Sequence, residues 1–393
     1  MAAVEFRNVD IVFGKDTTKA LAMVDQGRTR DEILAATGAV LGAANVNIAI
    51  DKGEICVLMG LSGSGKSTIL RAINGLNKVV RGQVLVEHEG RSIDVASCSG
   101  DQLRMLRTSR IAMVFQQFAL LPWRTVRENV GFGLELRGMP AAELREKVDA
   151  KLALVGLTQW ADKFAHQLSG GMQQRVGLAR AFATDADILL MDEPFSALDP
   201  LIRDKLQDEL LVLQKELKKT IVFVSHDLDE ALKIGNRIAI LEGGRIVQIG
   251  TGEDILLHPA NAYVAEFVKH MNPLNVLRGR SLMTPAASLR SDQGEVLLDP
   301  QGRIRVRLDG DGRPVGVTLN GAQGTIAIAN AETGLAPNPA DLIVAPVDLK
   351  MRAAIELRRA SGNPIVLVDQ LGRMAGLCGD DEIYRGLLAR SEV

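Results

Sequence analysis

Cysteine is scarce in this chain of 393 residues. Its three cysteines, Cys56, Cys98 and Cys378, are scattered and form no CxxC pair. This pattern excludes a disulfide framework and a CxxC metal site, and it favours a reducing compartment. Net charge is also nearly absent, at −2 from 46 basic and 48 acidic residues. No overall basic field is therefore available to attract nucleic acid or an anionic membrane, which leaves only a local basic patch for that role.

A membrane-spanning apolar run is lacking too. The uncharged stretch 33–50 comes nearest, but it consists largely of Ala and Gly and contains Thr37, Asn45 and Asn47. A spanning helix needs about 20 strongly apolar residues, so we expect a short helix that ends at Gly38, followed by a strand. The opening residues MAAVEFRNVD have no basic segment followed by an apolar one, and no secretory signal is expected.

What the chain does contain is typical of a soluble globular protein of two or three domains, with 47% hydrophobic and 24% charged residues. Apolar runs that read as buried strands lie at 55–59, 188–191 and 221–225. The last two flank a long helical pattern with apolar residues at Ile202, Leu206, Leu210, Leu213 and Leu217. Buried strands that alternate with helices predict an α/β fold with a parallel sheet covered on both faces.

The composition of the sequence changes after about Met271, where Gly, Pro and short runs of alternating apolar and polar residues become frequent. We therefore predict one domain at 1–271, a linker at 272–284 and a smaller α+β domain at 285–393.

The strongest motif is GLSGSGKS at 60–67, which fits G-x-x-x-x-G-K-[ST] and lies between a buried strand and a helix. Its glycines let backbone N–H groups face one concavity, and the helix N-terminus adds partial positive charge. Lys66 would reach the β- and γ-phosphates of a nucleotide, and the Ser67 hydroxyl would ligate Mg²⁺. The residues predicted to bind nucleotide here are Gly60, Leu61, Ser62, Gly63, Ser64, Gly65, Lys66, Ser67 and Thr68.

Two carboxylates follow the apolar strand at 188–191. Open α/β sheets present their sites at the carboxyl ends of strands. Asp192 is predicted to hold Mg²⁺, directly or through water, and Glu193 to act as the general base that polarises the attacking water. Alone, this pair would read as an acidic helix cap, but together with the phosphate loop it predicts a P-loop NTPase.

A third motif, LSGGM at 168–172, opens an amphipathic helix. A Ser-Gly-Gly helix start is a second anion-binding N-terminus, although by itself it is equally consistent with an ordinary capped helix. Two phosphate sites in one chain make sense if they belong to opposite faces of a dimer.

With these motifs, residues 4–270 resemble the ATP-binding-cassette (ABC) ATPases, of which LSGG is the hallmark. The fold implied is a RecA-like parallel core with antiparallel β and helical subdomains. Met172 stands where the family usually has Gln. That position matters less than the Ser169 hydroxyl and the Gly170 and Gly171 amides, so we expect ATPase activity to survive.

The resemblance assigns further roles residue by residue. Gln116 matches the loop glutamine that senses Mg²⁺ and water, with the adjacent Gln117 as its alternative. Asp199, in SALD, matches the loop that communicates across the dimer, and His226 matches the histidine that contacts the γ-phosphate. Phe13 matches the aromatic residue that stacks on adenine, although a core or edge-strand phenylalanine is its rival interpretation.

The implied partners are a second copy of the chain and a permease. Two copies would close head to tail, so that the phosphate loop of one and Ser169, Gly170 and Gly171 of the other enclose each ATP; hydrolysis would release them. Because no membrane span is expected here, integral-membrane subunits must carry the motion across the bilayer. The resemblance implies a peripheral position on the cytoplasmic face of the plasma membrane and no nucleic-acid partner.

Finer features are similar to importers of quaternary amines, which take up choline, glycine betaine or proline betaine. These features are GLSGSGKST, the insertion at 20–50 and Met172 within AHQLSGGMQQRVGLARA. Choline is favoured over glycine betaine, although the solute itself never touches this subunit. An extracytoplasmic solute-binding protein would be an indirect partner.

The region 285–393 is similar to a degenerate CBS-domain pair (the cystathionine-β-synthase-type module). Residues 351–391 predict helix, strand, tight turn, strand, helix, and 303–319 predict the strand–turn–strand of a first half. The usual G-x-[ST]-x-x-D nucleotide pattern is altered, with Cys378 at the Ser/Thr position and Gly321 at an Asp position. A packing or dimerisation module is therefore as well supported as a nucleotide-binding one.

One functional alternative stays open: a soluble ABC ATPase that acts on DNA or ribosomes without a permease. That class usually has two cassettes, a long coiled coil or a basic surface. This chain has one phosphate loop, no long heptad run and a net charge of −2. A phosphotransferase outside the ABC family would leave the LSGG motif unexplained.

Overall fold

The computed structural model describes residues 2–116, 118–196, 198–269, 271–292, 294–329 and 341–388. The chain forms two compact units, Met1–Thr251 and Gly252–Val393. Their division precedes the predicted linker at 272–284, because the helices that follow Thr251 pack within the second unit. These are α10 (Gly252–Leu257), α11 (Ala262–Val268) and α12 (Pro273–Val276).

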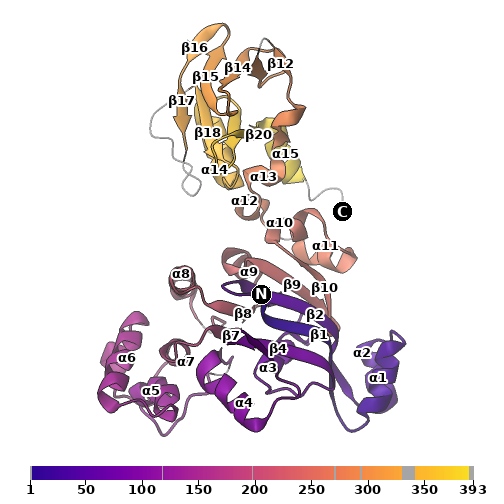
Figure 1. Cartoon of the computed structure of the whole chain (residues 1–393), viewed down its shortest axis with the longest axis vertical. Coiled ribbons are helices and arrows are strands. Elements are labelled where there is room, and N and C mark those ends of the chain that lie inside the picture. The colour runs from indigo at the N-terminus through magenta and orange to yellow at the C-terminus, as the bar shows by residue number, and fades with distance from the viewer. Residues whose placement is uncertain are drawn as a thin grey trace. The chain divides into compact units, whose positions relative to one another are not determined.

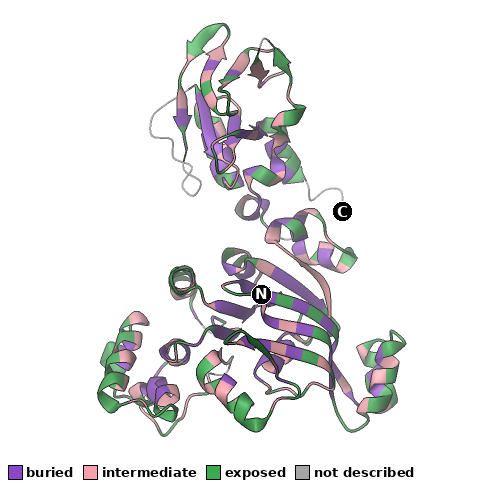
Figure 2. Ribbon diagram, in the orientation of Figure 1, coloured by how far each residue is buried: buried purple, intermediate pink, exposed green. Residues whose placement is uncertain are grey.

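The first unit is built on a six-stranded sheet with the order β10-β9-β3-β8-β7-β6, in which β10 alone runs antiparallel to its neighbour (Figure 1). The predicted parallel core is confirmed, and β3, β7 and β8 are buried at every position (Figure 2). The strands are β3 (Ile55–Met59), β6 (Ile111–Val114), β7 (Ile188–Asp192), β8 (Thr220–Val224), β9 (Arg237–Glu242) and β10 (Arg245–Gly250).

A second sheet of four antiparallel strands has the order β2-β1-β4-β5. Its strands are β1 (Ala2–Phe13), β2 (Val40–Asp51), β4 (Arg81–His88) and β5 (Arg91–Asp94). Helix α3 (Lys66–Ile73) contacts strands of both sheets and buries Ile69, Leu70 and Ile73 in their shared apolar core. The phosphate loop that precedes α3 is therefore held between the two sheets.

A group of helices forms the predicted helical part. Helices α5 (Val126–Leu136), α6 (Ala141–Leu154) and α7 (Gly170–Ala183) pack on one another around Val130, Val148 and Val176. Short helices α4 (Gly100–Met105) and α9 (Leu228–Ile234) connect strands. Helix α8 (Pro200–Leu217) confirms the predicted amphipathic helix, although Leu206 and Leu210 are buried while Leu217 is exposed.

The insertion folds as two short helices, α1 (Thr17–Asp25) and α2 (Arg30–Thr37), before strand β2 begins at Val40. Gly38 ends α2 in the left-handed conformation, with φ of 68°, which a residue without a Cβ adopts at little cost. The predicted helix–Gly38–strand order is confirmed. Among the described residues, no helix has both the length and the apolar character needed to cross a membrane.

The second unit contains two five-stranded sheets that share an apolar core around Val306, Leu342 and Val366. One has the order β11-β20-β19-β18-β17 and the other is the antiparallel meander β12 to β16. Its strands are β11 (Thr284–Pro285), β12 (Ser291–Asp292), β13 (Glu295–Leu297), β14 (Ile304–Leu308), β15 (Pro314–Leu319), β16 (Ala322–Gly324), β17 (Ile326–Ile328), β18 (Leu342–Pro346), β19 (Ile365–Val368) and β20 (Met374–Cys378).

Helices α14 (Met351–Ser361) and α15 (Asp380–Leu388) flank β19 and β20 in the chain, and α13 (Gly279–Leu282) precedes the sheets. The predicted order of helix, strand, tight turn, strand and helix is thus confirmed for the described part of the C-terminal segment. The predicted strand–turn–strand of the first half is confirmed by β14 and β15.

Two hairpin turns in the second unit, 309–313 and 369–373, repeat one another. In both, the opening aspartate donates its N–H to the carbonyl of the closing arginine at 2.9 Å. Its Oδ1 accepts the N–H groups of the third and fifth residues at 2.8–3.0 Å. The turns also touch, since Arg313 Nε donates to the Leu371 carbonyl at 3.0 Å. Two equivalent hairpins therefore meet at their tips.

Candidate functional site

The loop at 60–65 turns sharply between β3 and α3. Gly60, Gly63 and Gly65 have φ of 145°, 80° and 101°, values that side chains with a Cβ rarely adopt. Space is also restricted, because a Cβ on Gly60 would lie 2.3 Å from the Leu241 carbonyl oxygen and one on Gly65 would lie 2.4 Å from that of Gly42. Gly60 and Gly65 are therefore required by both backbone conformation and packing, and Gly63 by its backbone conformation.

Lys66 begins α3, and its side chain is folded back over the loop. Its Nζ donates to the carbonyl oxygens of Gly60 at 2.9 Å and Leu61 at 3.0 Å. Burial lowers the pKa of Lys66 below its ordinary value, and the carboxylates of Glu193 and Asp192 act in the opposite direction. The ammonium is thus held in the concavity where an anionic group would replace the carbonyl oxygens as its partner.

Asp192 ends strand β7 and is fully buried. One carboxylate oxygen accepts the Ser67 hydroxyl at 2.7 Å. The other accepts two bonds from Arg71, from Nε at 3.1 Å and Nη2 at 2.8 Å. The structure therefore brings together two of the three residues predicted for the Mg²⁺ site, Ser67 and Asp192, which are 125 positions apart.

The donor set fits a magnesium ion. Ser67, Asp192 and Gln116 offer hydroxyl, carboxylate and amide oxygens, the ligands that Mg²⁺ prefers, and one or two carboxylates with substrate phosphates are the usual arrangement. Among the described residues, no group of three or more His, Cys, Asp or Glu could hold a metal ion without such help. This composition favours an ion that arrives with a phosphate substrate.

Glu193 is the point at which the predicted catalytic residues meet. Its Oε2 accepts the Gln116 amide at 3.0 Å and lies 3.4 Å from His226 Nδ1. Glu193 itself has φ of 49°, and its N–H donates to the Val224 carbonyl at 3.2 Å. Strained backbone of this kind is often found where a side chain is aimed at a ligand. Gln117, the alternative to Gln116, lies outside the described residues.

An open depression of about 460 Å³ lies beside the phosphate loop. Phe13 lines it with its side chain partly exposed, so its placement supports the adenine-stacking interpretation over that of a buried core residue. A Cβ on Gly42 would lie 2.6 Å from Phe13 Cε2. Residue 42 must therefore be glycine for the Phe13 ring to occupy its position.

The signature residues belong to the helical part of the unit. Ser169 caps α7, with its Oγ accepting the Met172 N–H at 3.4 Å, and Gly170 and Gly171 form the first turn. Asp199 caps α8 by accepting the Ile202 N–H at 3.0 Å. Both are used locally in this chain, as helix caps, and neither role requires a ligand.

Three residues near the site escaped the reasoning from sequence: Arg71, Gly42 and Arg30. Arg71 had a usable signal, because it lies four positions after Ser67 on α3 and residues at that spacing share one helix face. Gly42 and Arg30 come from the strand and helix of the insertion. Their positions beside the loop depend on how the insertion packs, which no local pattern encodes.

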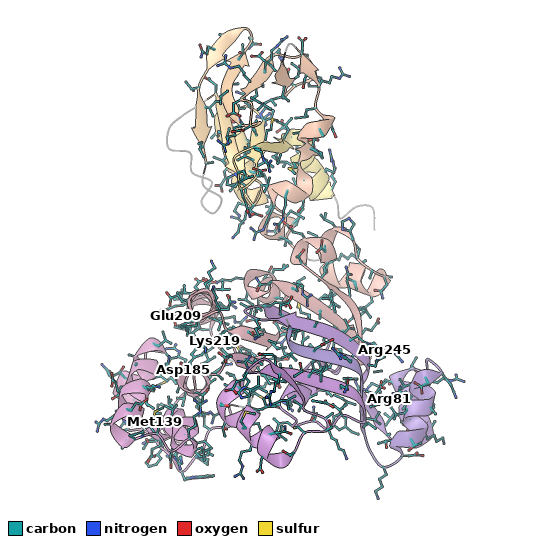
Figure 3. The ribbon with its side chains drawn as sticks, in the orientation of Figure 1. Arg81, Met139, Asp185, Glu209, Lys219 and Arg245 are labelled. Carbon is teal, nitrogen blue, oxygen red and sulfur yellow. The ribbon has the colours of Figure 1, made fainter. Side chains whose placement is uncertain are left out.

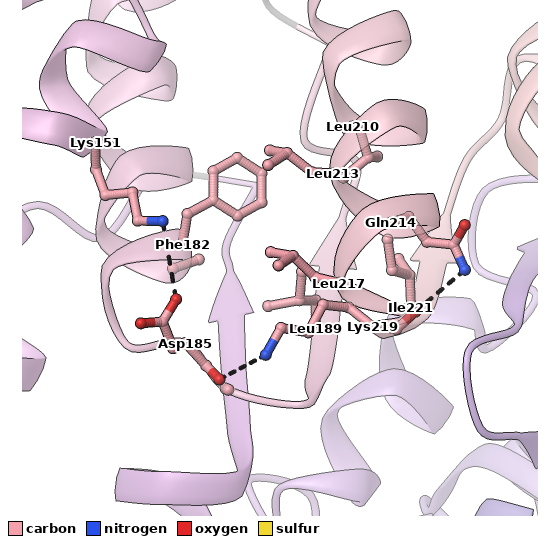
Figure 4. A pocket seen from close by; sticks show the side chains of 12 residues that line it. Lys151, Phe182, Asp185, Leu189, Leu210, Leu213, Gln214, Leu217, Lys219 and Ile221 are labelled. Carbon is pink, nitrogen blue, oxygen red and sulfur yellow. Dashed lines mark hydrogen bonds and ion pairs between the residues drawn. The ribbon is translucent and has the colours of Figure 1, made fainter.

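A second cavity in this unit lies where Phe182 of α7 faces Leu213 and Leu217 of α8 (Figure 4). At its edge Lys219 Nζ donates to the Asp185 carbonyl at 2.7 Å. The described residues that line it are mostly apolar and include none of the predicted site residues. Its polar lining residues are Lys151, Asp185, Gln214 and Lys219, and both lysines already bond to Asp185.

Comparison with known proteins places this geometry in context. The family model described as "ABC transporter" matches residues 43–196. A glycine betaine/proline betaine transport system ATP-binding protein, ProV of Escherichia coli, is 41% identical over 98% of this chain and 95% of its own length. The glycine betaine transport ATP-binding protein OpuAA of Bacillus subtilis is 49% identical over 74% of this chain and 69% of its own.

Two further comparisons bear on solute and chemistry. The choline transport ATP-binding protein OpuBA of B. subtilis is 43% identical over 57% of this chain and 57% of its own length. Among solved structures, the ATP-binding cassette MJ0796, in a dimeric post-hydrolysis state bound to ADP and Pi, is 33% identical with a TM-score of 0.55. That likeness covers 63% of this chain and 98% of the cassette.

Proposed function

The chain belongs to the ABC transporter family of ATP-binding proteins, as its motifs predict, and we propose that it is the ATP-hydrolysing subunit of a quaternary-amine importer. The observation that carries the ATPase is the convergence of Gln116 and His226 on Glu193, at the carboxyl end of the strand that also carries Asp192. The reaction is ATP plus water giving ADP and phosphate, with Mg²⁺ as the metal.

Binding uses the phosphate loop. The backbone N–H groups of the loop and the N-terminus of α3 receive the phosphates, and Lys66 exchanges its carbonyl partners for phosphate oxygens. Ser67 and Asp192 would hold Mg²⁺, which supplies charge neutralisation on the phosphate oxygens when it is bound. Arg71 orients the Asp192 carboxylate through its two bonds.

Hydrolysis uses Glu193 as the general base. Its carboxylate accepts a proton from the attacking water, while Gln116 and His226, which already lie against it, orient that water and the γ-phosphate. Both contacts are made to Oε2, so Oε1 can accept the water while they persist. Phe13 stacks on the adenine from the wall of the depression.

The signature residues act in trans in this proposal. Ser169, Gly170 and Gly171 lie at an exposed helix N-terminus and would meet the nucleotide held by a second copy of the chain, with Asp199 near the shared interface. The dimeric cassette with ADP and Pi supports this arrangement by analogy. ATP would close the dimer and hydrolysis would open it.

The importer role follows from the relatives. Those described above are ATP-binding proteins of transport systems for betaines and choline, and quaternary amines are their shared solute class. We infer a peripheral subunit on the cytoplasmic face of the plasma membrane, with permease subunits and an extracytoplasmic binding protein as partners. Choline is proposed ahead of glycine betaine. No observation favours the alternative of a soluble ABC ATPase that acts on DNA or ribosomes.

The region 285–393, which lies within the second unit, is proposed to be a CBS-like regulatory module that follows a cassette at 1–271 and a linker at 272–284. The repeated turns at 309–313 and 369–373 support two related halves, since equal bonding in two hairpins is what a duplicated sequence would produce. Cys378 is buried and its thiol pKa is raised by burial to about 12, so the altered nucleotide pattern offers an inert thiol there.

Uptake in cells tests the function. Labelled choline and glycine betaine are supplied to cells that carry wild-type protein, Glu193→Gln or Glu209→Gln, the last a matched control on α8. The expected result is that Glu193→Gln loses choline uptake, whereas wild-type protein and Glu209→Gln keep it. Loss of glycine betaine uptake instead would overturn the choline proposal and keep the importer. No change in either, with redundant importers deleted, would overturn the quaternary-amine proposal.

A further inference from the structure

The wall of the depression beside the phosphate loop is completed by the insertion. Arg30 of α2 and Val40 and Gly42 of β2 line it from the insertion. The other lining residues are Phe13 of β1, Gly63 and Gly65 of the loop, and Lys66, Ser67 and Thr68 of α3. This lining holds two cations, Lys66 and Arg30, and no carboxylate. Lys66 belongs to the phosphate loop itself, whereas nothing in the motifs accounts for Arg30.

Arg30 is fixed at its backbone. It is the first residue of α2, directly after Thr29, which forms a capping box with Glu32. The Thr29 N–H donates to Glu32 Oε2 at 2.8 Å, and the Glu32 N–H donates to Thr29 Oγ1 at 3.3 Å. One turn later Ile33 is buried in an apolar cluster with residues of β1 and β2. The start of α2 is therefore set by a cap and by packing together.

The insertion is also tied to the sheet by charge. Arg81 of β4, labelled in Figure 3, donates two bonds to Asp25 at the end of α1, at 2.9 and 2.7 Å, and a third to Asp10 of β1 at 2.5 Å. Asp10 is buried and also accepts the Asn45 N–H at 2.8 Å. The Arg81–Asp25 bonds tie α1 to the sheet, and α2 in turn packs on α1 and β2, so the helix that carries Arg30 is supported from both sides.

The guanidinium of Arg30 donates from Nη1 to the Gly63 carbonyl oxygen. Gly63 has φ of 80°, a conformation that the loop must keep for its N–H groups to face a phosphate. In a trans peptide the carbonyl and the following N–H point in opposite directions. The following N–H, that of Ser64, donates to the Leu61 carbonyl at 3.1 Å, so Arg30 and Leu61 together hold the two sides of the peptide between Gly63 and Ser64.

We propose that Arg30 is a binding residue for the nucleoside triphosphate, supplied by the insertion. This rests on the proposed ATPase function. Arg30 orients the Gly63 peptide and adds a positive charge beside the polyphosphate of ATP, so it strengthens nucleotide binding and takes no part in water activation. The insertion thereby becomes a part of the nucleotide site.

The experiment compares four variants of the full chain: Arg30→Ala, Arg30→Lys, Arg28→Ala and Lys66→Ala. Arg28 is the matched control, because it lies two residues away, pairs with Glu32 at 3.2 Å and does not line the depression. Equilibrium binding of ATP is measured by dialysis, and KM and kcat by phosphate release, at low and high salt. Melting temperatures without nucleotide check that α2 stays folded.

Arg30→Ala is expected to raise the Kd and KM for ATP about tenfold, with kcat within about twofold of wild type. Arg30→Lys restores part of the affinity, because the charge remains but the planar donor is lost. The difference between wild type and Arg30→Ala shrinks at high salt. Arg28→Ala binds ATP as wild type does.

Two results would overturn the proposal: an unchanged Kd in Arg30→Ala, or an equal loss in Arg28→Ala. A fall in kcat with unchanged KM would also overturn it, since it would move Arg30 into the chemical step. Failure of the ATPase proposal looks different: wild type would bind no ATP, or Lys66→Ala would bind it as well as wild type does.

Discussion

Acidic residues end strands or open turns in both compact units, but their oxygen atoms are engaged differently. In the first unit, the partners of Asp192 and Glu193 are side chains from α3, from the loop after β6 and from the loop after β8. In the second unit, Asp309 and Asp369 accept N–H groups of their own turns. Backbone bonds lower the pKa of Asp369, with Arg373 contributing.

This difference distinguishes carboxylates that can bind a ligand from carboxylates that stabilise a turn. A carboxylate held by groups from distant segments can exchange those partners for a ligand while the fold stays intact. A carboxylate bonded to the N–H groups of its own turn cannot do so without undoing the turn. The following expectations test the contrast, from the largest effect to the smallest.

Glu193→Gln should lower ATP hydrolysis at least ~100-fold, because the proposed general base is removed while the shape of the side chain remains. ATP binding should persist, since the phosphate loop is untouched. Phosphate release and equilibrium binding measure the two properties, with Glu209→Gln as the control. Near-normal turnover would show that the contacts of Gln116 and His226 with Glu193 serve the fold and not catalysis. The acidic residues of the two units would then no longer differ in role.

Gly42→Ala should raise the KM for ATP about fivefold or more, because the new methyl group would meet Phe13 Cε2 at 2.6 Å and Thr68 Cγ2 at 2.9 Å. Gly100→Ala is the matched control, since nothing lies within 4 Å of the Cβ it would add. Steady-state kinetics decide the point. An equal KM in both variants would remove the depression from the nucleotide site.

A chain that ends at Thr251 should fold and hydrolyse ATP within about twofold of the full chain, since it contains every predicted site residue and a complete apolar core. A second chain that ends at Asn275, nearer the boundary expected from composition, sharpens the comparison by adding α10 and α11. If only the longer chain folds, the first unit needs those helices and the two units are less separate than their contacts indicate.

Asp309→Ala should lower the melting temperature of the second unit by a few degrees and leave kcat unchanged, because it removes the two bonds of the turn at 309–313 that Asp309 Oδ1 accepts. Asp369→Ala, in the repeated turn, should behave alike. Calorimetry of the full chain measures this. A loss of ATPase activity in either variant would join the second unit to the catalytic machinery.

The pH dependence of Glu230 provides the smallest effect. Burial raises its pKa above the ordinary 4.5, with Asp227 adding to the rise, while bonds from Ser225 and Gln207 and the charge of Arg203 oppose it. The folded state thus binds the proton more tightly than the unfolded state. Stability relative to Glu230→Gln should be greatest below about pH 4.5 and decline as the pH rises through the raised value. Melting curves of both proteins from pH 4 to 8 measure this. A difference in melting temperature between wild type and Glu230→Gln that stays constant with pH would contradict it.

The motif-bearing parts of the fold were predictable because each has a local cause. The buried run at 55–59, the glycines of the phosphate loop and the amphipathic helix after Asp199 are all encoded by residues within one element. The repeated hairpins follow in the same way from an Asp at the first position and a Gly at the fourth position of each turn. The division of the chain has no such local cause: α10 packs on α11 and on α12, and these contacts group the helices after Thr251 with the second unit.

The sequence by itself determined the chemistry: a phosphate loop, two carboxylates after a strand, a signature helix and a histidine at a strand end. Their types and their order along the chain are enough to predict an ATPase of this family. The tertiary structure decided which donors meet which acceptors. Arg71 on Asp192, Gln116 and His226 on Glu193, and Arg30 on Gly63 join segments between 33 and 121 residues apart. Such contacts depend on how sheets and helices pack, and no local pattern records that.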